Sequence, residues 1–183
     1  MKTKILTFLG FLFFSINYGQ VTQEWIATYD SEVSLMDAAT KSYIDVSGNV
    51  YVTGARATGY INPENPDEGE TFECVLIKYN PDGVEQWVQS YQSGVNLLSQ
   101  GLAITSDTSG NIVIAGLYSS EYVTSEEFGN YNLYNGFIAK YDNSGNELWT
   151  QTFDGTQSTT DWFDNVVIDA QDNIYVSGTT NRN

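Results

Sequence analysis

The chain has 183 residues, enough for one domain of ordinary size or for part of a larger protein. Its 7 Lys and Arg against 23 Asp and Glu give a formal charge of −16, which argues against binding to nucleic acid or to an anionic membrane. It has no histidine and one cysteine, so a Ser-His-Asp or Cys-His centre, a histidine-ligated metal and an intramolecular disulfide are all excluded.

The first predicted element is a secretory signal peptide over residues 1–19. Lys2 and Lys4 form a basic start, residues 5–16 form a short apolar run, and Gly19 is a small residue at its exit. The alternative, a membrane anchor, is disfavoured because so short a helix cannot cross a bilayer core of roughly 30 Å, and no other apolar run is long enough. We therefore expect export with cleavage before Gln20, a secreted or cell-surface location, and 5 basic against 23 acidic residues in the mature chain.

A repeat of 62 residues runs through residues 20–183. Tryptophans, other aromatics, aspartates and glycines recur at this spacing without insertion or deletion, which indicates one structural unit used several times. The matched positions are Trp25, Trp87 and Trp149; Tyr29, Tyr91 and Phe153; Asp45, Asp107 and Asp169; Gly54, Gly116 and Gly178; and Gly83 and Gly145.

Each unit predicts four short strands that are rich in Val, Ile, Tyr, Phe and Trp and are bounded by Gly, Asn, Asp and Pro. No stretch of ten residues after the signal peptide has convincing helical periodicity, so the predicted fold class is all-β. We expect four-stranded antiparallel sheets in a set order along the chain. The expected spans are an orphan strand over 24–30, a first unit over about 38–91, a second over about 100–153, and half a third over about 162–178.

Turn sequences predict two tight hairpins in each unit. Asn80-Pro81-Asp82-Gly83 is typical of a type I turn followed by a glycine with positive φ, and residues 142–145, 45–48 and 107–110 have the same pattern. These turns lie at one end of the predicted sheet. The segments 55–72 and 117–136 are predicted as long loops at the other end, which is where binding is usually found on a rigid scaffold.

Four antiparallel strands per repeat are typical of β-propeller blades. Residues 45–54, DVSGNVYVTG, and the later runs VLIKYNPDGVEQW and FIAKYDNSGNELW resemble the bacterial β-propeller repeat (SBBP) family. The resemblance covers Trp25 to Gly178 and implies a secreted or cell-surface propeller, but it implies no activity. The blades would be longer than usual in that family, and there would be too few of them.

The number of blades raises a question of its own. The predicted elements make an incomplete ring of two full blades with a partial one at each end, whereas closed propellers have about 4 to 8 blades. Stacked repeats are stabilised by their interfaces, so the end blades are expected to need neighbours. Two explanations stay open: further blades in the same longer chain, or self-association that completes the ring.

Two sets of repeated residues have both a structural and a functional interpretation. The turn aspartates could bind Ca²⁺, but each turn supplies only one carboxylate, apart from Asp169 and Asp172, and an aspartate at the first turn position ordinarily accepts a backbone N–H. The tryptophans could form a ligand platform, but their recurrence at matched strand positions favours packing between blades. We therefore predict no metal and no cofactor.

The candidate ligand site is the second long loop. Exposed aromatic rings beside carboxylates can stack on sugars or bind cations, although packing of these rings is an equally open interpretation. The residues concerned are Tyr118, Tyr122, Glu126, Glu127, Tyr131 and Tyr134. A glycosidase role for the two glutamates is disfavoured because adjacent residues on an extended loop point apart. The acidic first loop, 60–73, is interpreted as a solvated loop.

Two classes of function are compatible with these features. The first is a secreted or cell-surface module for binding or adhesion, with a glycan or protein ligand and no catalysis of its own. The alternative is a non-catalytic part of a larger secreted hydrolase or lyase that contains a propeller domain. The absence of histidine and of a clustered carboxylate or thiol site favours a binding module over a hydrolase or lyase whose own catalytic residues lie on the propeller loops.

Overall fold

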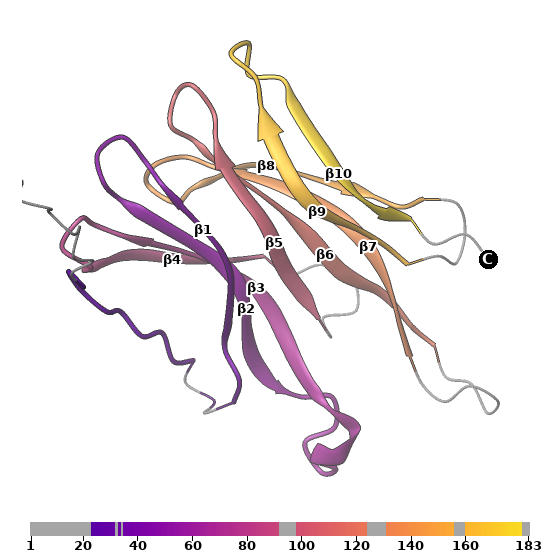
Figure 1. Ribbon diagram of the computed structural model, residues 1–183. Coiled ribbons are helices and arrows are strands. Elements are labelled where there is room, and N and C mark those ends of the chain that lie inside the picture. The colour runs from indigo at the N-terminus through magenta and orange to yellow at the C-terminus, as the bar shows by residue number, and fades with distance from the viewer. Residues whose placement is uncertain are drawn as a thin grey trace, which may run out of the picture.

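The computed structural model describes residues 23–31, 33, 35–91, 98–123, 131–155 and 160–180. These residues form ten strands and one short 3-10 helix, and they contain no α-helix (Figure 1). The strands are β1 (Ala38–Ile44), β2 (Val50–Tyr60), β3 (Glu70–Tyr79), β4 (Glu85–Tyr91), β5 (Ser99–Ser106), β6 (Ile112–Val123), β7 (Tyr131–Tyr141), β8 (Glu147–Phe153), β9 (Asp161–Ile168) and β10 (Ile174–Thr180).

Neighbouring strands pair antiparallel in three separate sheets that do not close on one another. We call them blade 1 (β1–β4), blade 2 (β5–β8) and blade 3 (β9 and β10). The first two are four-stranded sheets in chain order, so the predicted all-β fold with two full blades and part of a third is confirmed.

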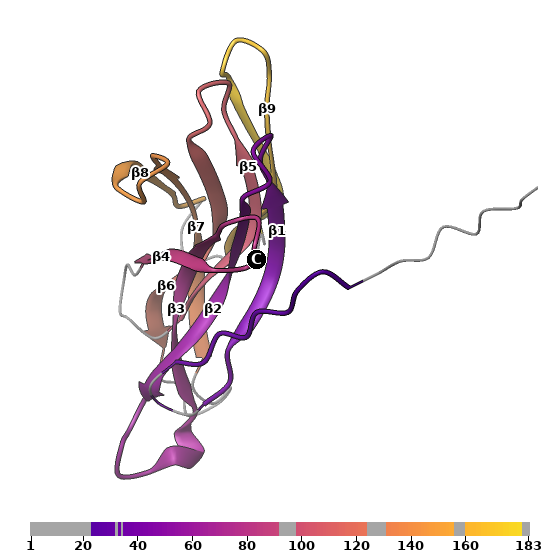
Figure 2. The same ribbon diagram turned by 90° about the vertical axis from the view of Figure 1, so that its left-hand side faces the viewer.

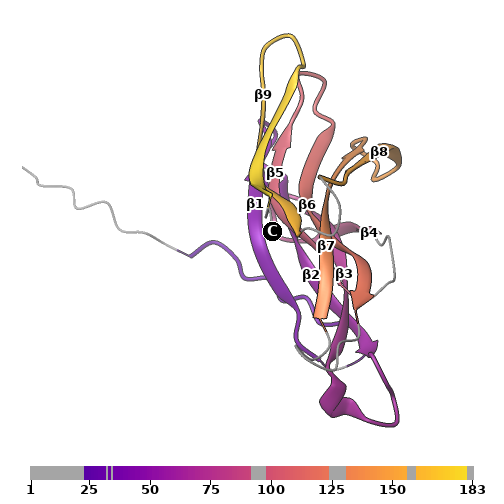
Figure 3. The same ribbon diagram turned by 90° about the vertical axis from the view of Figure 1, so that its right-hand side faces the viewer.

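The blades stack face to face in chain order. Strands β1, β5 and β9 run side by side along one edge of the stack. Strands β4 and β8 lie on the opposite edge and project away from the other strands (Figures 2 and 3). We call the face of each blade that is turned toward the next blade its front face, and the opposite one its back face. Because side chains alternate along a strand, each blade has an apolar layer on both faces.

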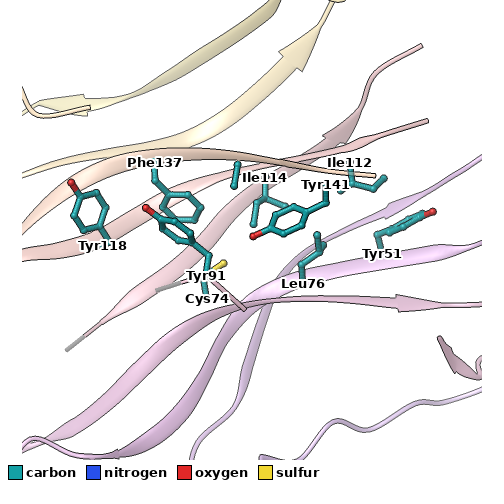
Figure 4. Close-up of a cluster of buried hydrophobic side chains, with 10 residues drawn as sticks. Tyr51, Cys74, Leu76, Tyr91, Ile112, Ile114, Tyr118, Phe137 and Tyr141 are labelled. Atoms are coloured by element: carbon teal, nitrogen blue, oxygen red, sulfur yellow. The ribbon is translucent and has the colours of Figure 1, made fainter. Parts of the chain in front are cut away.

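The largest hydrophobic cluster lies between blade 1 and blade 2. The front face of blade 1 contributes Tyr51, Cys74, Leu76 and Tyr91, and the back face of blade 2 contributes Ile112, Ile114, Tyr118, Phe137, Ala139 and Tyr141 (Figure 4). A second cluster between blades 2 and 3 contains Ala103, Val113, Ala115 and Val166. Burial of these faces is the main stabilising contribution to the stack.

The five tight turns share one hydrogen-bonding pattern. Oδ1 of Asp45 accepts the N–H groups of Ser47 and Asn49 at 2.8 and 2.9 Å, and Oδ2 accepts Nδ2 of Asn49 at 2.8 Å. The pattern recurs in full at the turns that begin with Asp107, Asp142 and Asp169, and the two backbone bonds recur at Asn80. All four carboxylates are thus engaged as turn acceptors, which is the interpretation that the sequence favoured over Ca²⁺ binding.

The predicted long loops are wrong for half of the first segment and for most of the second. Strands β2 and β3 continue as a paired hairpin to Tyr60 and Glu70, and β6 and β7 continue to Val123 and Tyr131. The glycines at 54, 116 and 178 do not end a strand. Each lies opposite a register shift, where an added Cβ would overlap a carbonyl oxygen of the neighbouring strand, so only glycine lets the strand continue past the bulge.

The predicted orphan strand over 24–30 is not a hydrogen-bonded strand. Residues 23–31 are extended and lie over the back face of blade 1, without a partner strand among the described residues. Trp25 and Tyr29 pack there on a cluster formed by Val75, Ile77 and Tyr79. The segment therefore occupies the place of a fourth strand without its backbone pairing.

The predicted signal peptide over 1–19 lies outside the described residues. Within the described part of the chain, no helix has the length and apolar character that a membrane crossing requires.

Candidate interaction surfaces

Two hairpin arms project from the same end of blades 1 and 2 (Figure 1). Arm 1 consists of the outer parts of β2 and β3 with the 3-10 helix η1 (Pro66–Glu68) at its tip, and arm 2 consists of the outer parts of β6 and β7. Near the core, β2 pairs with β1 and β6 pairs with β5. Beyond the bulge glycines, β2 and β6 continue past the ends of these partner strands and form the arms.

The tip of arm 1 is ordered by its own hydrogen bonds. The N–H of Ile61 donates to the carbonyl of Gly69 at 2.9 Å, and Asn62 and Asn65 both donate to Glu68 Oε1, at 3.1 and 2.9 Å. Three carboxylates on this tip are exposed, at Glu64, Asp67 and Glu68. No ion pair involves them within the described residues, so the arm presents uncompensated negative charge to solvent.

Arm 2 carries the residues that the sequence proposed as a ligand site, and the structure distributes them differently. Tyr118 is buried in the cluster between blades 1 and 2, and Tyr134 is half-buried. In the strand pairing near the end of the arm, Tyr122 lies opposite Asn132 and Tyr131 lies opposite Val123. Glu126 and Glu127 lie outside the described residues. The ring of Tyr118 is therefore a packing group, since it faces Tyr91 and Phe137 and not solvent (Figure 4).

Trp25 and Trp87 each contact the turn between the third and fourth strands of the following blade. Nε1 of Trp87 donates to the carbonyl of Asn143 at 3.2 Å, and its ring lies against Gly145. Trp25 makes the same contact one blade earlier, with a 3.0 Å hydrogen bond to the Pro81 carbonyl and its ring against Gly83. The glycine at each turn has positive φ, and its missing side chain makes room for the indole.

Trp149 occupies the same repeat position on β8 and is half-buried. Its indole N–H makes no hydrogen bond within the part of the chain that the structure describes. The sequence predicted that these tryptophans pack between blades, and it did not indicate the turn on which each one lies.

The front face of blade 3 is uncovered in the described structure. Val167 and Tyr175 are 52% and 54% exposed, whereas Tyr51, at the position of Tyr175 in blade 1, is 0% exposed. Ser177 is also exposed, and its counterpart Thr53 is fully buried. The sequence predicted that the end blades need neighbours, but it did not indicate which residues of blade 3 form the uncovered face.

The back face of blade 1 is only partly covered by residues 23–31. A pocket of about 300 Å³ remains beside this segment, and its lining includes Trp25, Tyr29, Ala39, Val52 and Ile77. Ala39 is exposed there, whereas its counterpart in blade 2, Gly101, is buried against Thr53.

Residues 23–31 are also held by a polar contact, which we call the polar latch and which consists of Tyr29, Arg56 and Glu73. Arg56 donates from Nη1 to the Tyr29 hydroxyl at 2.8 Å and from Nε to Glu73 Oε1 at 2.5 Å, and it forms an ion pair with that carboxylate. Burial alone would lower the pKa of Arg56, but its bonds to Tyr29 and Glu73 outweigh burial and raise the pKa, so the guanidinium stays charged.

The aspartate of the first turn has a different partner in blade 2 than in blade 1. In blade 2, Lys140 Nζ lies 2.7 Å from Asp107 Oδ2. Burial would raise the pKa of Asp107, but the bonds from Lys140 and Asn111 lower it below its ordinary value of 3.8.

In blade 1, the hydroxyl of Tyr51 contacts Asp45 Oδ2 at 3.3 Å. Burial, with the nearby Asp45, raises the pKa of Tyr51 to about 12. The position of Tyr51 in the repeat is occupied in blade 2 by Val113, which has no hydroxyl and packs in the cluster between blades 2 and 3. Lys78, the counterpart of Lys140, instead donates to Asn143 of blade 2 at 3.1 Å.

No group of three or more His, Cys, Asp or Glu residues in the described part of the chain is placed to hold a metal ion. Cys74 is fully buried, and burial raises the pKa of its thiol to about 12, so it is not a reactive thiolate at neutral pH.

No protein-family model matches the chain. The chain is 28% identical over 158 residues to an uncharacterized WD repeat-containing protein of Acanthamoeba polyphaga mimivirus, in an alignment that covers 76% of this chain and 11% of that protein. It thus spans about a tenth of the length of that relative. Together with the stacked antiparallel blades, this similarity identifies a β-propeller-type repeat protein.

Proposed function

We propose that this protein is a secreted or cell-surface propeller module, of the kind that the SBBP resemblance implies, which binds a protein or glycan and has no catalytic activity of its own. The observation that carries the proposal is the pair of arms at one end of adjacent blades, of which arm 1 has an ordered tip with exposed Glu64, Asp67 and Glu68. A preordered tip loses little conformational entropy on binding, so its contacts contribute more to affinity.

The charge of the arm indicates the chemistry of its partner. Carboxylates without a neighbouring cation attract basic side chains and accept hydrogen bonds from sugar hydroxyls, and the chain charge of −16 steers cationic partners toward it. Export is supported by the tripartite start of the sequence, with Lys2 and Lys4 before the apolar run.

A binding experiment with matched charge variants tests the proposal. The full chain would be probed on an array of defined glycans and of Lys- and Arg-rich peptides. In the tip variant, Glu64→Gln, Asp67→Asn and Glu68→Gln remove three charges from arm 1. In the control variant, Asp82→Asn, Glu85→Gln and Glu147→Gln remove three exposed charges from the turn end of the blades.

We expect the tip variant to lose about tenfold in affinity for its ligand, and the control variant to bind like the unchanged chain. Equal losses in both variants would indicate attraction to the net charge alone. Absence of binding to any member of the array would contradict the proposal.

The proposed location has a separate test. N-terminal sequencing of protein exported from a bacterial host should give a chain that begins at or near Gln20. Soluble cytoplasmic protein that retains Met1 would contradict export.

A further inference from the structure

The two ends of the blade stack expose faces that are complementary to one another. The exposed front face of blade 3 corresponds by repeat position to the front faces of blades 1 and 2, which are buried. The exposed part of the back face of blade 1 corresponds to the buried back faces of blades 2 and 3. The exposed front face of blade 3 and the exposed back face of blade 1 are therefore of the two kinds that pack against each other inside the stack.

The internal interfaces show how such faces fit. Strand β5 packs across β1, β2 and β3 of blade 1, and β9 packs across β5, β6 and β7 of blade 2. In each case the first strand of a blade crosses the front face of the preceding blade.

Residue pairs at matched positions support a fit between the two exposed faces. Thr53 meets Gly101 so closely that a Cβ on the glycine would overlap the Thr53 hydroxyl. The corresponding exposed pair is Ser177 with Ala39, in which one side has lost a methyl group and the other has gained one. The total volume is thus conserved, as close packing requires.

At a second matched pair of positions, two polar residues meet between blades 1 and 2, and two apolar residues are exposed at the ends of the stack. The hydroxyl of Tyr43 lies 2.6 Å from Ser106 Oγ where β1 and β5 run side by side. The residues at the corresponding exposed positions are Val167 and Ile44, which are 52% and 65% exposed. Both partners change from polar to apolar together, and both lie uncovered at opposite ends of the stack.

We propose that a second copy of this chain docks head to tail on the first, with the front face of blade 3 in one copy packed on the back face of blade 1 in the next. In this arrangement β1 of the second copy crosses β9 and β10 of the first. Residues 23–31 of the second copy stay on blade 1 and flank the docked strands. The contact joins two different surfaces, so it leads to a closed ring or to an open filament. It is independent of the arms and of any ligand bound there.

The test uses one blocking variant for each face. Ser177→Glu places a carboxylate on the front face of blade 3, and Ala39→Glu places one on the back face of blade 1. Both positions are exposed within one chain, so each variant should fold, whereas a carboxylate enclosed without a partner in the interface would prevent docking. Light scattering of the full chain at about 0.15 M salt measures the result, since salt screens the repulsion between acidic chains beyond about 8 Å.

We expect the unchanged chain to increase in mass over about a hundredfold range of concentration, as association by mass action requires. Each variant alone should remain at the mass of one chain. A mixture of equal amounts should form a two-chain complex that grows no further, because the intact front face of the Ala39→Glu chain fits the intact back face of the Ser177→Glu chain.

Three outcomes would overturn the proposal: an unchanged chain that stays at single-chain mass at every concentration, a single variant that associates as the unchanged chain does, or a mixture that stays monomeric. Cooperative thermal melting checks that each variant folds. Val167→Glu and Ile44→Glu form a second pair on the same two faces, and would replace the first pair if either of its members failed to fold.

Discussion

Two junctions in this molecule use the same repeat positions with opposite chemistry. Between blades 1 and 2, the ring of Tyr91 stacks on that of Phe137 with their centroids 4.1 Å apart, and Tyr118 is buried beside them. Between residues 23–31 and blade 1, Tyr29 has the position of Tyr91, but it meets Arg56 at the position of Tyr118.

The comparison shows that the repeat determines the position of a contact but not the residue type that makes it. The repeat determines which positions face a neighbour, and the residues there determine how firmly that neighbour is held. Buried rings contribute several kcal/mol each, whereas the hydrogen bond from Arg56 to the Tyr29 hydroxyl contributes about 1 kcal/mol. Residues 23–31 are therefore attached more weakly than any blade.

Removal of the stacked ring should have the largest effect. We expect Phe137→Ala to lower the free energy of unfolding by about 3–5 kcal/mol, because the fully buried ring leaves a cavity between blades 1 and 2. Val75→Ala, at the same repeat position under residues 23–31, should cost less. Denaturant melts would measure both, and equal losses would contradict the difference that we infer between the junctions.

The turn glycines should come next. Gly145→Val and Gly83→Val should each cost about 1–3 kcal/mol, because a β-branched residue resists their φ of +86° and +78°. We expect the larger loss at Gly145, since Trp87 is fixed in the paired strand β4 and Trp25 lies in an unpaired segment that can move aside. An unchanged midpoint for both variants would show that the tight turns tolerate side chains.

Acid should weaken the interior of blade 2 through Asp107. Its pKa is lower in the folded chain than the ordinary 3.8, so its contribution to stability is present above that value and is lost as pH falls through the folded pKa. We expect Asp107→Asn to cost about 1–2 kcal/mol at pH 7 and to flatten the loss of stability below pH 3.8. Thermal melts between neutral and acidic pH would measure this, and a variant with the unchanged acid profile would contradict it.

The smallest effect should come from the polar latch. Arg56→Met together with Glu73→Gln should cost about 0–1 kcal/mol of global stability, because the double change leaves no buried charge without its partner, yet it should make residues 23–31 more sensitive to limited proteolysis. Lys41→Met is the matched control, because it removes one charge from an exposed side chain of the same blade without touching the segment. Equal cleavage rates in the two variants would mean that Arg56 does not hold the segment.

The turns were the most predictable part of the fold because their chemistry is local. Asp45 bonds to groups two and four residues ahead, so the sequence of a turn contains all of its partners. The spacing of the repeat then predicted the sheets, since each blade repeats the same strands in the same order.

The arms and the latch were not predictable, for two physical reasons. A glycine after an apolar run, such as Gly54, can end a strand or occupy a bulge, and only the crowding against Ala38 decides between them. Arg56 and its partner Tyr29 depart from the repeat together, and no pattern in the sequence connects them. Tyr118 was placed in a ligand site because tyrosine suits both water and a core, and the rings that bury it come from elsewhere in the chain.

The indole of Trp25 has a spectroscopic consequence. It lies on Pro81 and Gly83 at the weakest junction of the molecule, and its emission depends on whether residues 23–31 cover blade 1. Trp87 makes the same contact within the firm junction and supplies an internal reference of matched geometry. Release of the segment would move the Trp25 ring into water and shift its emission to longer wavelength while Trp87 stayed unchanged, so the protein contains its own optical probe of local opening.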